Sequence, residues 1–320
     1  MQSILNRAQP VQLVLDTDML TDCDDLAALG MLHTLESMGE ARLLAVTVSS
    51  REPRSAPVVD AVNTYYGRPD IPVGAPKNGR GAYRPDSCFL EPVAAEFPHR
   101  LRSNEDAPDA VTLLRRVLWE HTCVVLLTIG YLTNVAGLLQ SGPDDVCPLS
   151  GMELVERSVT EWVCMGGNFP VDDASDNVNF TRDPEPAIYA LQHYPGRMTF
   201  VGREIGHQIF AGNGLKQTPR ENPVRRGYEL HRGRYGDDWN HHTADPSTVL
   251  YAVRGCRDYF TVQPGRMLLE ADCSFRWDAG QSSNQSYLVQ RIDRGQMGAL
   301  LERLICAPPG KPAGEVSGGR

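Results

Sequence analysis

Five aspartates stand within ten residues near the N-terminus, and their types and spacing could do chemistry: Asp16, Asp18, Asp22, Asp24 and Asp25. So many like charges repel one another unless a cation neutralises them. Carboxylate oxygens are hard ligands that suit calcium or magnesium rather than zinc. The spacing therefore predicts a site for a divalent cation; the alternative is a solvated acidic loop in which one Asp caps a helix.

The elements around these acids place them at the edge of a sheet. An apolar run, Val11 to Leu15, predicts a buried strand directly before them, and leucines recur at helical spacing from Leu26 to Leu35 directly after them. Strand-like and helix-like segments then alternate, which predicts an α/β fold with a single open, mostly parallel sheet and helices on both faces. Ligands bind such sheets at the carboxyl ends of the strands, where the acids lie.

The whole chain sets limits on organisation and partners. Its 320 residues, 41% of them apolar, predict one domain over residues 11–306, with an N-terminal extension at 1–10 and a disordered tail at 307–320. A net charge of -9 argues against nucleic acid or an anionic membrane as partner. Eight cysteines without CxxC spacing, and the lack of a long apolar run, predict a reduced cytoplasmic protein.

Several segments follow the acid-rich loop in a defined order: the turn from Thr128 to Asn134 (TIGYLTN), Met165-Gly166-Gly167, Asn179 before Asp183-Pro184-Glu185, and Asp245-Pro246. Together they resemble the inosine/uridine-preferring nucleoside hydrolase family, over roughly Val11 to Leu304. The resemblance implies hydrolysis of the N-glycosidic bond of a ribonucleoside or related riboside, with a tightly held calcium ion. It also implies a homo-oligomer, a dimer or a tetramer.

The resemblance assigns roles to individual residues. Asp18, Asp25 and Asp245 would bind calcium through their carboxylates, and Ile129 through its backbone carbonyl. Asp18 would also act as the general base on the calcium-bound water. Asp24 and Asn179 would each hold a ribose hydroxyl.

The sequence departs from the family pattern near the metal and the leaving group. Two extra residues separate Asp18 from Asp24, so Asp22 could replace one of the assigned acids. Ala244 stands where relatives often carry the histidine associated with protonating the departing base. His241 and His242 could substitute as acids, and the alternative for both is a solvated loop.

A further departure concerns the sugar. Asn177 stands where the family has a ribose-binding glutamate, and an amide stabilises an oxocarbenium-like transition state less well than a charge does. Asn168, in a long acidic segment, could contribute to the sugar pocket, and the alternative is a solvated loop. Glu204 follows a predicted strand and would lie at the active edge, and the alternative is an acid that favours the dipole of a helix start. The polar stretch 212–243 predicts a long loop or a small helical excursion covering the site.

Two other functions stay open at this point. The first is a non-catalytic relative that binds calcium and sugar without turnover, which Ala244 and Asn177 motivate. The second is a phosphatase of the haloacid dehalogenase type, with Asp16 as nucleophile, Asp18 as acid/base, and magnesium. Leu20, where that motif expects Thr or Val, argues against the phosphatase.

Overall fold

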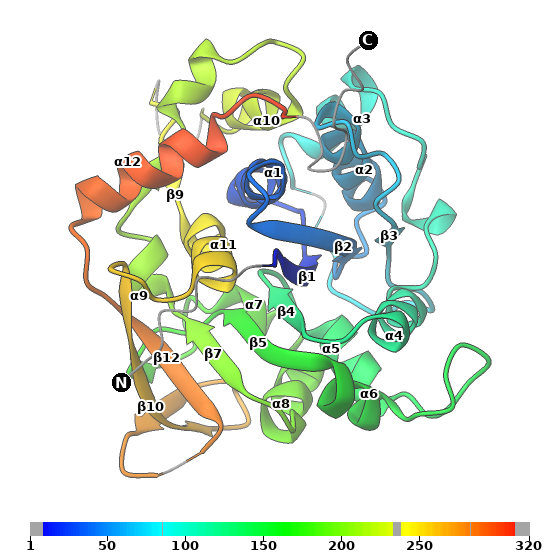
Figure 1. The fold of residues 1–320 in the computed structure, drawn as a ribbon, viewed down its shortest axis with the longest axis vertical. Helices are drawn as coiled ribbons and strands as arrows, with labels where there is room; N and C mark the ends of the chain where they lie inside the picture. The colour runs from blue at the N-terminus through cyan, green and yellow to red at the C-terminus, as the bar shows by residue number, and fades with distance from the viewer. Residues whose placement is uncertain (1–8, 85, 233–237, 282, 311–320) are drawn as a thin grey trace.

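The computed structural model describes residues 9–84, 86–232, 238–281 and 283–310. The chain forms a ten-stranded sheet with helices on both faces (Figure 1). Most of the predicted N-terminal extension, and the predicted tail beyond Gly310, lie outside the described residues. Over the described part of the chain, no helix has the length and apolar content needed to cross a membrane.

The elements alternate along the chain as predicted. The strands are β1 (Val11–Thr17), β2 (Ala41–Val48), β3 (Val73–Gly74), β4 (Val124–Thr128), β5 (Val159–Met165), β6 (Val171–Asp172), β7 (Met198–Val201), β8 (Phe210–Ala211), β9 (His241–His242), β10 (Phe260–Leu269), β11 (Phe275–Asp278) and β12 (Gln285–Gln290). The α-helices are α1 (Asp24–Ser37), α2 (Ser55–Tyr65), α3 (Leu90–Glu96), α4 (Ala110–Glu120), α5 (Thr133–Gln140), α6 (Gly151–Ser158), α7 (Val178–Thr181), α8 (Pro184–His193), α9 (Arg203–Gly206), α10 (Pro223–His231), α11 (Ala244–Arg254) and α12 (Arg294–Ile305). Two 3-10 helices, η1 (Asn104–Asp106) and η2 (Asn213–Gln217), lie in the connections.

The sheet is mostly parallel, which confirms the predicted fold class. Its strand order is β3-β2-β1-β4-β5-β7-β12-β10-β11-β6. The first seven strands in that order run parallel, whereas β10, β11 and β6 add an antiparallel edge. That edge was not predicted, because β10 carries exposed polar residues and lacks the continuous apolar run of a buried parallel strand.

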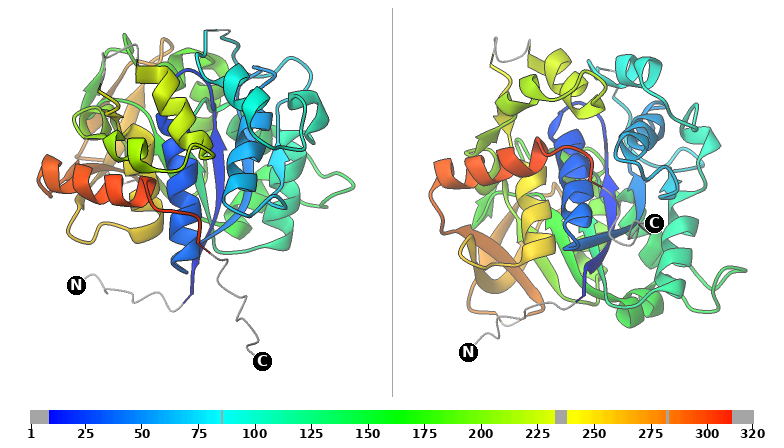
Figure 2. Two further views of the ribbon diagram at one scale, coloured as in Figure 1. Left: turned by 90° about the horizontal axis from the view of Figure 1, so that it is seen from above. Right: turned by 45° about the horizontal axis from the view of Figure 1, so that its top comes forward.

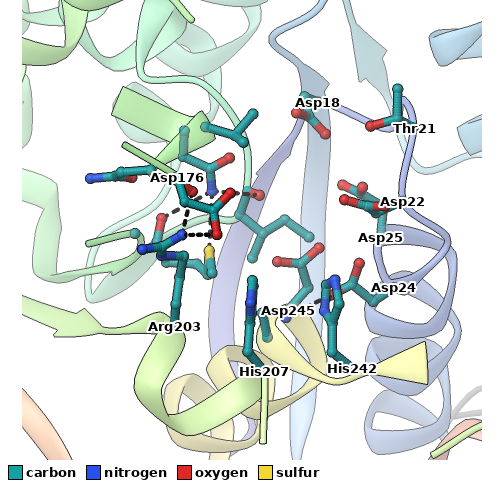
Figure 3. Close-up of a pocket in the computed structure, with 17 residues that line it drawn as sticks. Asp18, Thr21, Asp22, Asp24, Asp25, Asp176, Arg203, His207, His242 and Asp245 are labelled. Atoms are coloured by element: carbon teal, nitrogen blue, oxygen red, sulfur yellow. Dashed lines mark hydrogen bonds and ion pairs between the residues drawn. The ribbon is translucent and has the colours of Figure 1, made fainter. Parts of the chain in front are cut away.

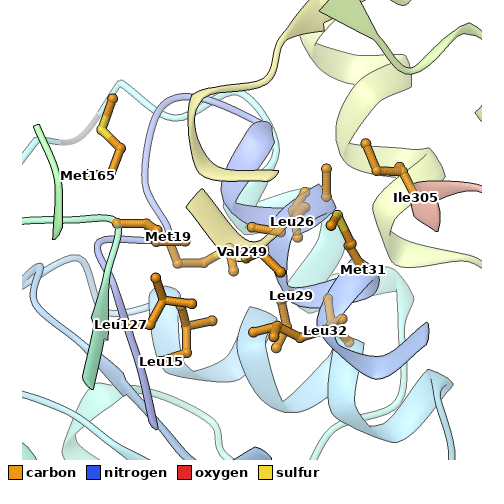
Figure 4. Close-up of a cluster of buried hydrophobic side chains, with 14 of the residues drawn as sticks. Leu15, Met19, Leu26, Leu29, Met31, Leu32, Leu127, Met165, Val249 and Ile305 are labelled. Atoms are coloured by element: carbon orange, nitrogen blue, oxygen red, sulfur yellow. The ribbon is translucent and has the colours of Figure 1, made fainter. Parts of the chain in front are cut away.

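Two apolar layers enclose the parallel strands. One layer packs α1, α2, α3, α10, α11 and α12 against one face, and the other packs α4, α5, α6 and α8 against the opposite face (Figure 1). Helix α1 is buried on nearly all sides, because α12 packs across it (Figure 2) and α2, α10 and α11 contact it as well. Leu26, Leu29 and Leu32 therefore lie in the core with Leu15 and Val249 (Figure 4).

The polar stretch 212–243 forms a helical excursion, one of the two predicted outcomes. It contains η2 and α10, and it ends in β9, which pairs antiparallel with β8. Residues 233–237 of this stretch lie outside the described residues. The pairing of β8 with β9 holds His241 and His242 beside the start of α1.

Candidate active site

A cavity of about 330 Å³ opens at the carboxyl ends of the parallel strands. Figure 3 shows carboxylates from the loop after β1, from the start of α1 and from α11 along one wall. We call this the acidic wall; it consists of Asp18, Asp22, Asp24, Asp25 and Asp245. Asp176, Asn177, Asn179 and Arg203 line the other side, which we call the amide wall.

Asp16, at the end of β1, fixes the start of the acid-rich loop through buried hydrogen bonds. Its carboxylate accepts hydrogen bonds from the Thr47 hydroxyl at the end of β2 and from the Asn134 amide of α5. The same amide donates to the carbonyl of Val48 at 2.8 Å. Burial raises the pKa of Asp16 to about 7. Because the Asp16 side chain is fully buried and lies outside the residues that line the cavity, it cannot serve as the nucleophile of a phosphatase.

Gly130 brings the turn after β4 against the acid-rich loop. A Cβ at this position would collide with the backbone nitrogen of Asp18 and with the backbone of Thr17, so the approach requires glycine. The amide of Ile129 donates to the carbonyl of Asp16 at 2.8 Å. Ile129 lines the cavity together with Asp18.

Three carboxylates converge most closely on the acidic wall. Oxygen atoms of Asp24, Asp25 and Asp245 all lie within 4.8 Å of one another, and all three side chains are buried. Burial, together with the negative charges around them, raises the pKa of Asp25 and Asp245 well above the usual range. Asp22 is farther out, with its side chain 45% exposed, so Asp24 and not Asp22 takes the place beside Asp25.

Asp18 lies on the same wall beside these acids. Burial, and the negative charge of Asp22, raise the pKa of its carboxyl to about 7. Buried carboxylates are stable as ions only when a counter-charge or hydrogen-bond donors compensate them. The donor set, all oxygen and strongly negative, therefore fits a hard divalent cation such as calcium or magnesium.

His242 faces the acidic wall. Its Nδ1 atom lies 3.3 Å from Oδ2 of Asp24, and its ring stacks on that of His207 at 4.4 Å between centroids. Although burial opposes it, the charge of Asp24 raises the pKa of His242. His242 and His207 both line the cavity.

His241 lies behind His242 and is not among the described residues that line the cavity. Its Nε2 atom lies 3.8 Å from Oδ1 of Asp24. Burial lowers the pKa of His241 to about 4. Of the two histidines proposed from the sequence, the structure brings only His242 to the cavity surface.

Two of the asparagines that the sequence proposed for sugar binding, Asn177 and Asn179, line the cavity. Asn179 donates through Nδ2 to the carbonyl oxygens of Ile129 and Met165, at 3.2 Å each. Asn177 is buried, and its Oδ1 accepts a hydrogen bond from the amide of Gly167 at 3.3 Å. Its Nδ2 atom has no hydrogen-bond partner among the described residues.

Two of the residues predicted to bind substrate lie away from the cavity surface. Glu204 accepts a hydrogen bond from the amide of Phe169 at 3.0 Å, and burial raises its pKa to about 7. Asn168 turns its amide toward the carbonyl of Val171, at 3.5 Å. Neither side chain is among the described residues that line the cavity.

Arg203, His207 and Asp176 line the cavity but were not singled out from the sequence. Arg203 stands next to Glu204, which was selected because it follows β7. The start of α9 turns the arginine, rather than the glutamate, toward the cavity. The only signal in the sequence that could have identified Arg203 was therefore its position after a strand at the active edge.

The fold and the cavity define an α/β protein with a carboxylate-lined site at the carboxyl edge of its sheet. The profile of the family described as inosine-uridine preferring nucleoside hydrolase matches residues 13–299. The chain belongs to this family, which confirms the resemblance found in the sequence. A comparison with curated protein sequences gives no match.

Solved structures share the fold at low sequence identity. The purine-preferring ribonucleoside hydrolase from Gardnerella vaginalis is 18% identical, with a TM-score of 0.69 over 92% of this chain and 98% of its own. The inosine-uridine preferring nucleoside hydrolase from Bacillus anthracis is 16% identical, with a TM-score of 0.66 over 92% and 99%. The type III effector protein XopQ, complexed with adenosine diphosphate ribose, is 18% identical, with a TM-score of 0.64 over 94% of each chain.

Proposed function

We propose that this chain hydrolyses the N-glycosidic bond of a ribonucleoside or related riboside, with calcium as cofactor and Asp18 as general base. The observation that carries the proposal is the convergence of buried carboxylates, Asp24, Asp25 and Asp245, in one cavity with Asp18 and His242. Membership of the nucleoside hydrolase family supports the reaction class.

The cation would be held by Asp18, Asp25, Asp245 and the carbonyl of Ile129, which all line the cavity. Asp24, whose oxygens converge with those of Asp25 and Asp245, can join this set or hold a ribose hydroxyl. When bound, calcium supplies Lewis acidity toward water and sugar hydroxyls, and it neutralises the acidic wall. All of these ligands are oxygens, the donor type that calcium prefers.

The chain's own groups perform the proton transfers. Asp18 accepts a proton from the attacking water, and the remaining carboxylates stabilise the positive charge that develops on the ribose ring. Asn179 would hold a ribose hydroxyl, as an amide can donate or accept a hydrogen bond.

His242 would protonate the departing base. The Asp24 carboxylate, 3.3 Å from Nδ1, orients the ring and favours its protonated form. His242 therefore compensates for Ala244, which stands where relatives often carry the leaving-group histidine.

The test is ribose release from purine and pyrimidine nucleosides by Asp18→Asn and by the wild type, both loaded with calcium. Because Asp18 is also a proposed calcium ligand, both proteins are assayed at saturating calcium. The variant should still bind ribose under these conditions while turnover is lost, because the substitution removes the base. Ribose binding without turnover in the wild type would instead favour a non-catalytic sugar-binding relative.

A further inference from the structure

The amide wall contains two hydrogen-bond donors that have no acceptor among the described residues. They are Nδ2 of Asn177 and Nε of Arg203, and both residues line the cavity. The Asn177 side chain is buried, with the whole residue only 1% exposed. A buried donor without a partner is costly, so each of these atoms lacks an acceptor that a water or a ligand could supply.

The two donors lie on one small framework. The backbone amide of Arg203 donates to the carbonyl of Gly167 at 2.9 Å, and the amide of Gly167 donates to Oδ1 of Asn177. The Arg203 guanidinium also donates from Nη1 to the backbone carbonyl of Asp176, the residue before Asn177. Gly167 and Asp176 therefore tie Arg203 to the segment that carries Asn177.

Among the described residues, the Arg203 guanidinium forms an ion pair with Asp176, and the charges of Asp172, Asp173 and Glu204 also act on it. Nη1 of Arg203 lies 2.6 Å from Oδ2 of Asp176, whose side chain is 74% exposed. An exposed carboxylate is hydrated and contributes little as an ion-pair partner, so a ligand can exchange with it. Figure 3 shows this pair at the opposite side of the cavity from Asp22, Asp24 and Asp25.

The distribution of charge across the cavity determines which ligand groups the two donors can bind. The acidic wall repels an anion, whereas the amide wall offers the Arg203 guanidinium, paired with the exposed carboxylate of Asp176, and the amide donor of Asn177. Arginine binds phosphate and carboxylate groups through several parallel hydrogen bonds, which a neutral hydroxyl cannot match. Asn177 fits the same ligand, because a carboxylate at this position would repel an anion and an amide does not.

We infer that Arg203 and Asn177 form a subsite for an anionic group carried by the riboside substrate. The inference rests on the proposed function and narrows its substrate to anionic ribosides. The anion is either a phosphate on the sugar or a carboxylate on the leaving base, and both present the acceptor oxygens that the two donors require.

The test compares uridine, uridine 5′-monophosphate and orotidine, which share a pyrimidine and differ by a phosphate or a carboxylate. With calcium present, kcat/KM for one of the anionic ribosides should exceed that for uridine by about 10- to 100-fold, as expected for charged hydrogen bonds. Preference for uridine 5′-monophosphate identifies a phosphate subsite, and preference for orotidine identifies a carboxylate subsite.

The variants assign the preference to the two residues. Arg203→Met should bring the ratio of kcat/KM for the anionic riboside to kcat/KM for uridine close to one, and Arg203→Lys should retain part of the preference. Asn177→Asp should lower kcat/KM for the anionic riboside more than kcat/KM for uridine. Arg303→Met, which removes an exposed guanidinium on α12, is the matched control and should keep the preference.

A binding measurement separates this inference from the proposed hydrolysis. Isothermal titration with ribose 5-phosphate, orotate and ribose should show tighter binding of one anion, lost in Arg203→Met even if no riboside is cleaved. Equal turnover of all three ribosides, with equal effects of Arg203→Met on each, would overturn the subsite and leave the hydrolase intact. Absence of both anion binding and turnover would overturn both.

Discussion

Nδ1 of His242 lies 3.3 Å from Oδ2 of Asp24, so a carboxylate of the acidic wall orients a histidine at the surface of the cavity. This pairing leaves the other ring nitrogen as the one available to a leaving group. We predict that His242→Gln lowers kcat/KM for inosine by about 10²–10⁴-fold, the usual contribution of a general acid. The same variant should change turnover of nitrophenyl riboside little, because nitrophenolate departs without protonation.

The control for this prediction is His193→Gln, at the exposed end of α8, which should leave both substrates unaffected. If His242→Gln lowers kcat/KM equally for inosine and nitrophenyl riboside, the histidine does not act on the leaving group.

Cation binding should stabilise the fold, because a divalent ion relieves the repulsion among buried carboxylates. Ligand binding to the native state adds about 2.7 kcal/mol at a calcium concentration 100 times the dissociation constant. Thermal unfolding should therefore shift upward by several degrees on adding calcium, and Asp245→Asn should abolish the shift. Asp258→Asn, an exposed acid outside the cavity, should keep it. A Tm that no divalent cation moves would contradict the assignment of this cluster as a metal site.

Asp18→Asn should reduce hydrolysis of every riboside, including nitrophenyl riboside, by at least about 10²-fold, since a general base serves all leaving groups. This distinguishes Asp18 from His242, because the rate loss in His242→Gln should depend on the leaving group of the substrate. Circular dichroism should show an unchanged fold, because Asn retains the size of Asp. Comparable rates in Asp18→Asn and wild type would remove Asp18 as the base.

His33 should make stability depend on pH, away from the cavity. Burial lowers its pKa from 6.5 to about 3, and Nε2 lies 2.8 Å from Oδ1 of Asn63. The unfolded chain therefore binds the proton first, so this stability is present above pH 6.5 and is lost as the pH falls toward 3. Between pH 7 and pH 5 the loss is about 2 kcal/mol.

Urea unfolding of wild type and His33→Gln at pH 7 and pH 5 measures this contribution, because all other titrating groups are shared. The variant should lose about 2 kcal/mol less free energy of unfolding on acidification than the wild type. Equal losses in the two proteins would show that His33 does not drive the dependence.

The parallel part of the fold could be predicted because local patterns specify it. Val11 to Leu15 and Val124 to Ile129 are continuous apolar runs, and both became central strands of the sheet. The antiparallel edge could not be predicted in this way. Its pairing of β6 with β11 joins residues about a hundred positions apart, and the two strands, of two and four residues, are too short to give a clear apolar pattern.

The acidic half of the site was visible in the sequence, since Asp18, Asp24 and Asp25 stand close together and Asp245 follows a family motif. The amide wall was less visible. Arg203 follows β7 and Asp176 follows β6, 27 positions earlier, and no local spacing encodes their ion pair. Glu204 was chosen by its position after a strand and Asn168 as part of a long acidic segment, but their side chains turn toward the backbone atoms of Phe169 and Val171.

The most direct test of the account is ribose release by the wild-type chain from a panel of nucleosides, uridine 5′-monophosphate, orotidine and nitrophenyl riboside, with calcium or with a chelator. We predict turnover of at least one riboside with calcium and loss of that turnover with chelator. Turnover that persists unchanged with chelator, or no ribose release from any member with calcium present, would contradict a calcium-dependent N-ribohydrolase.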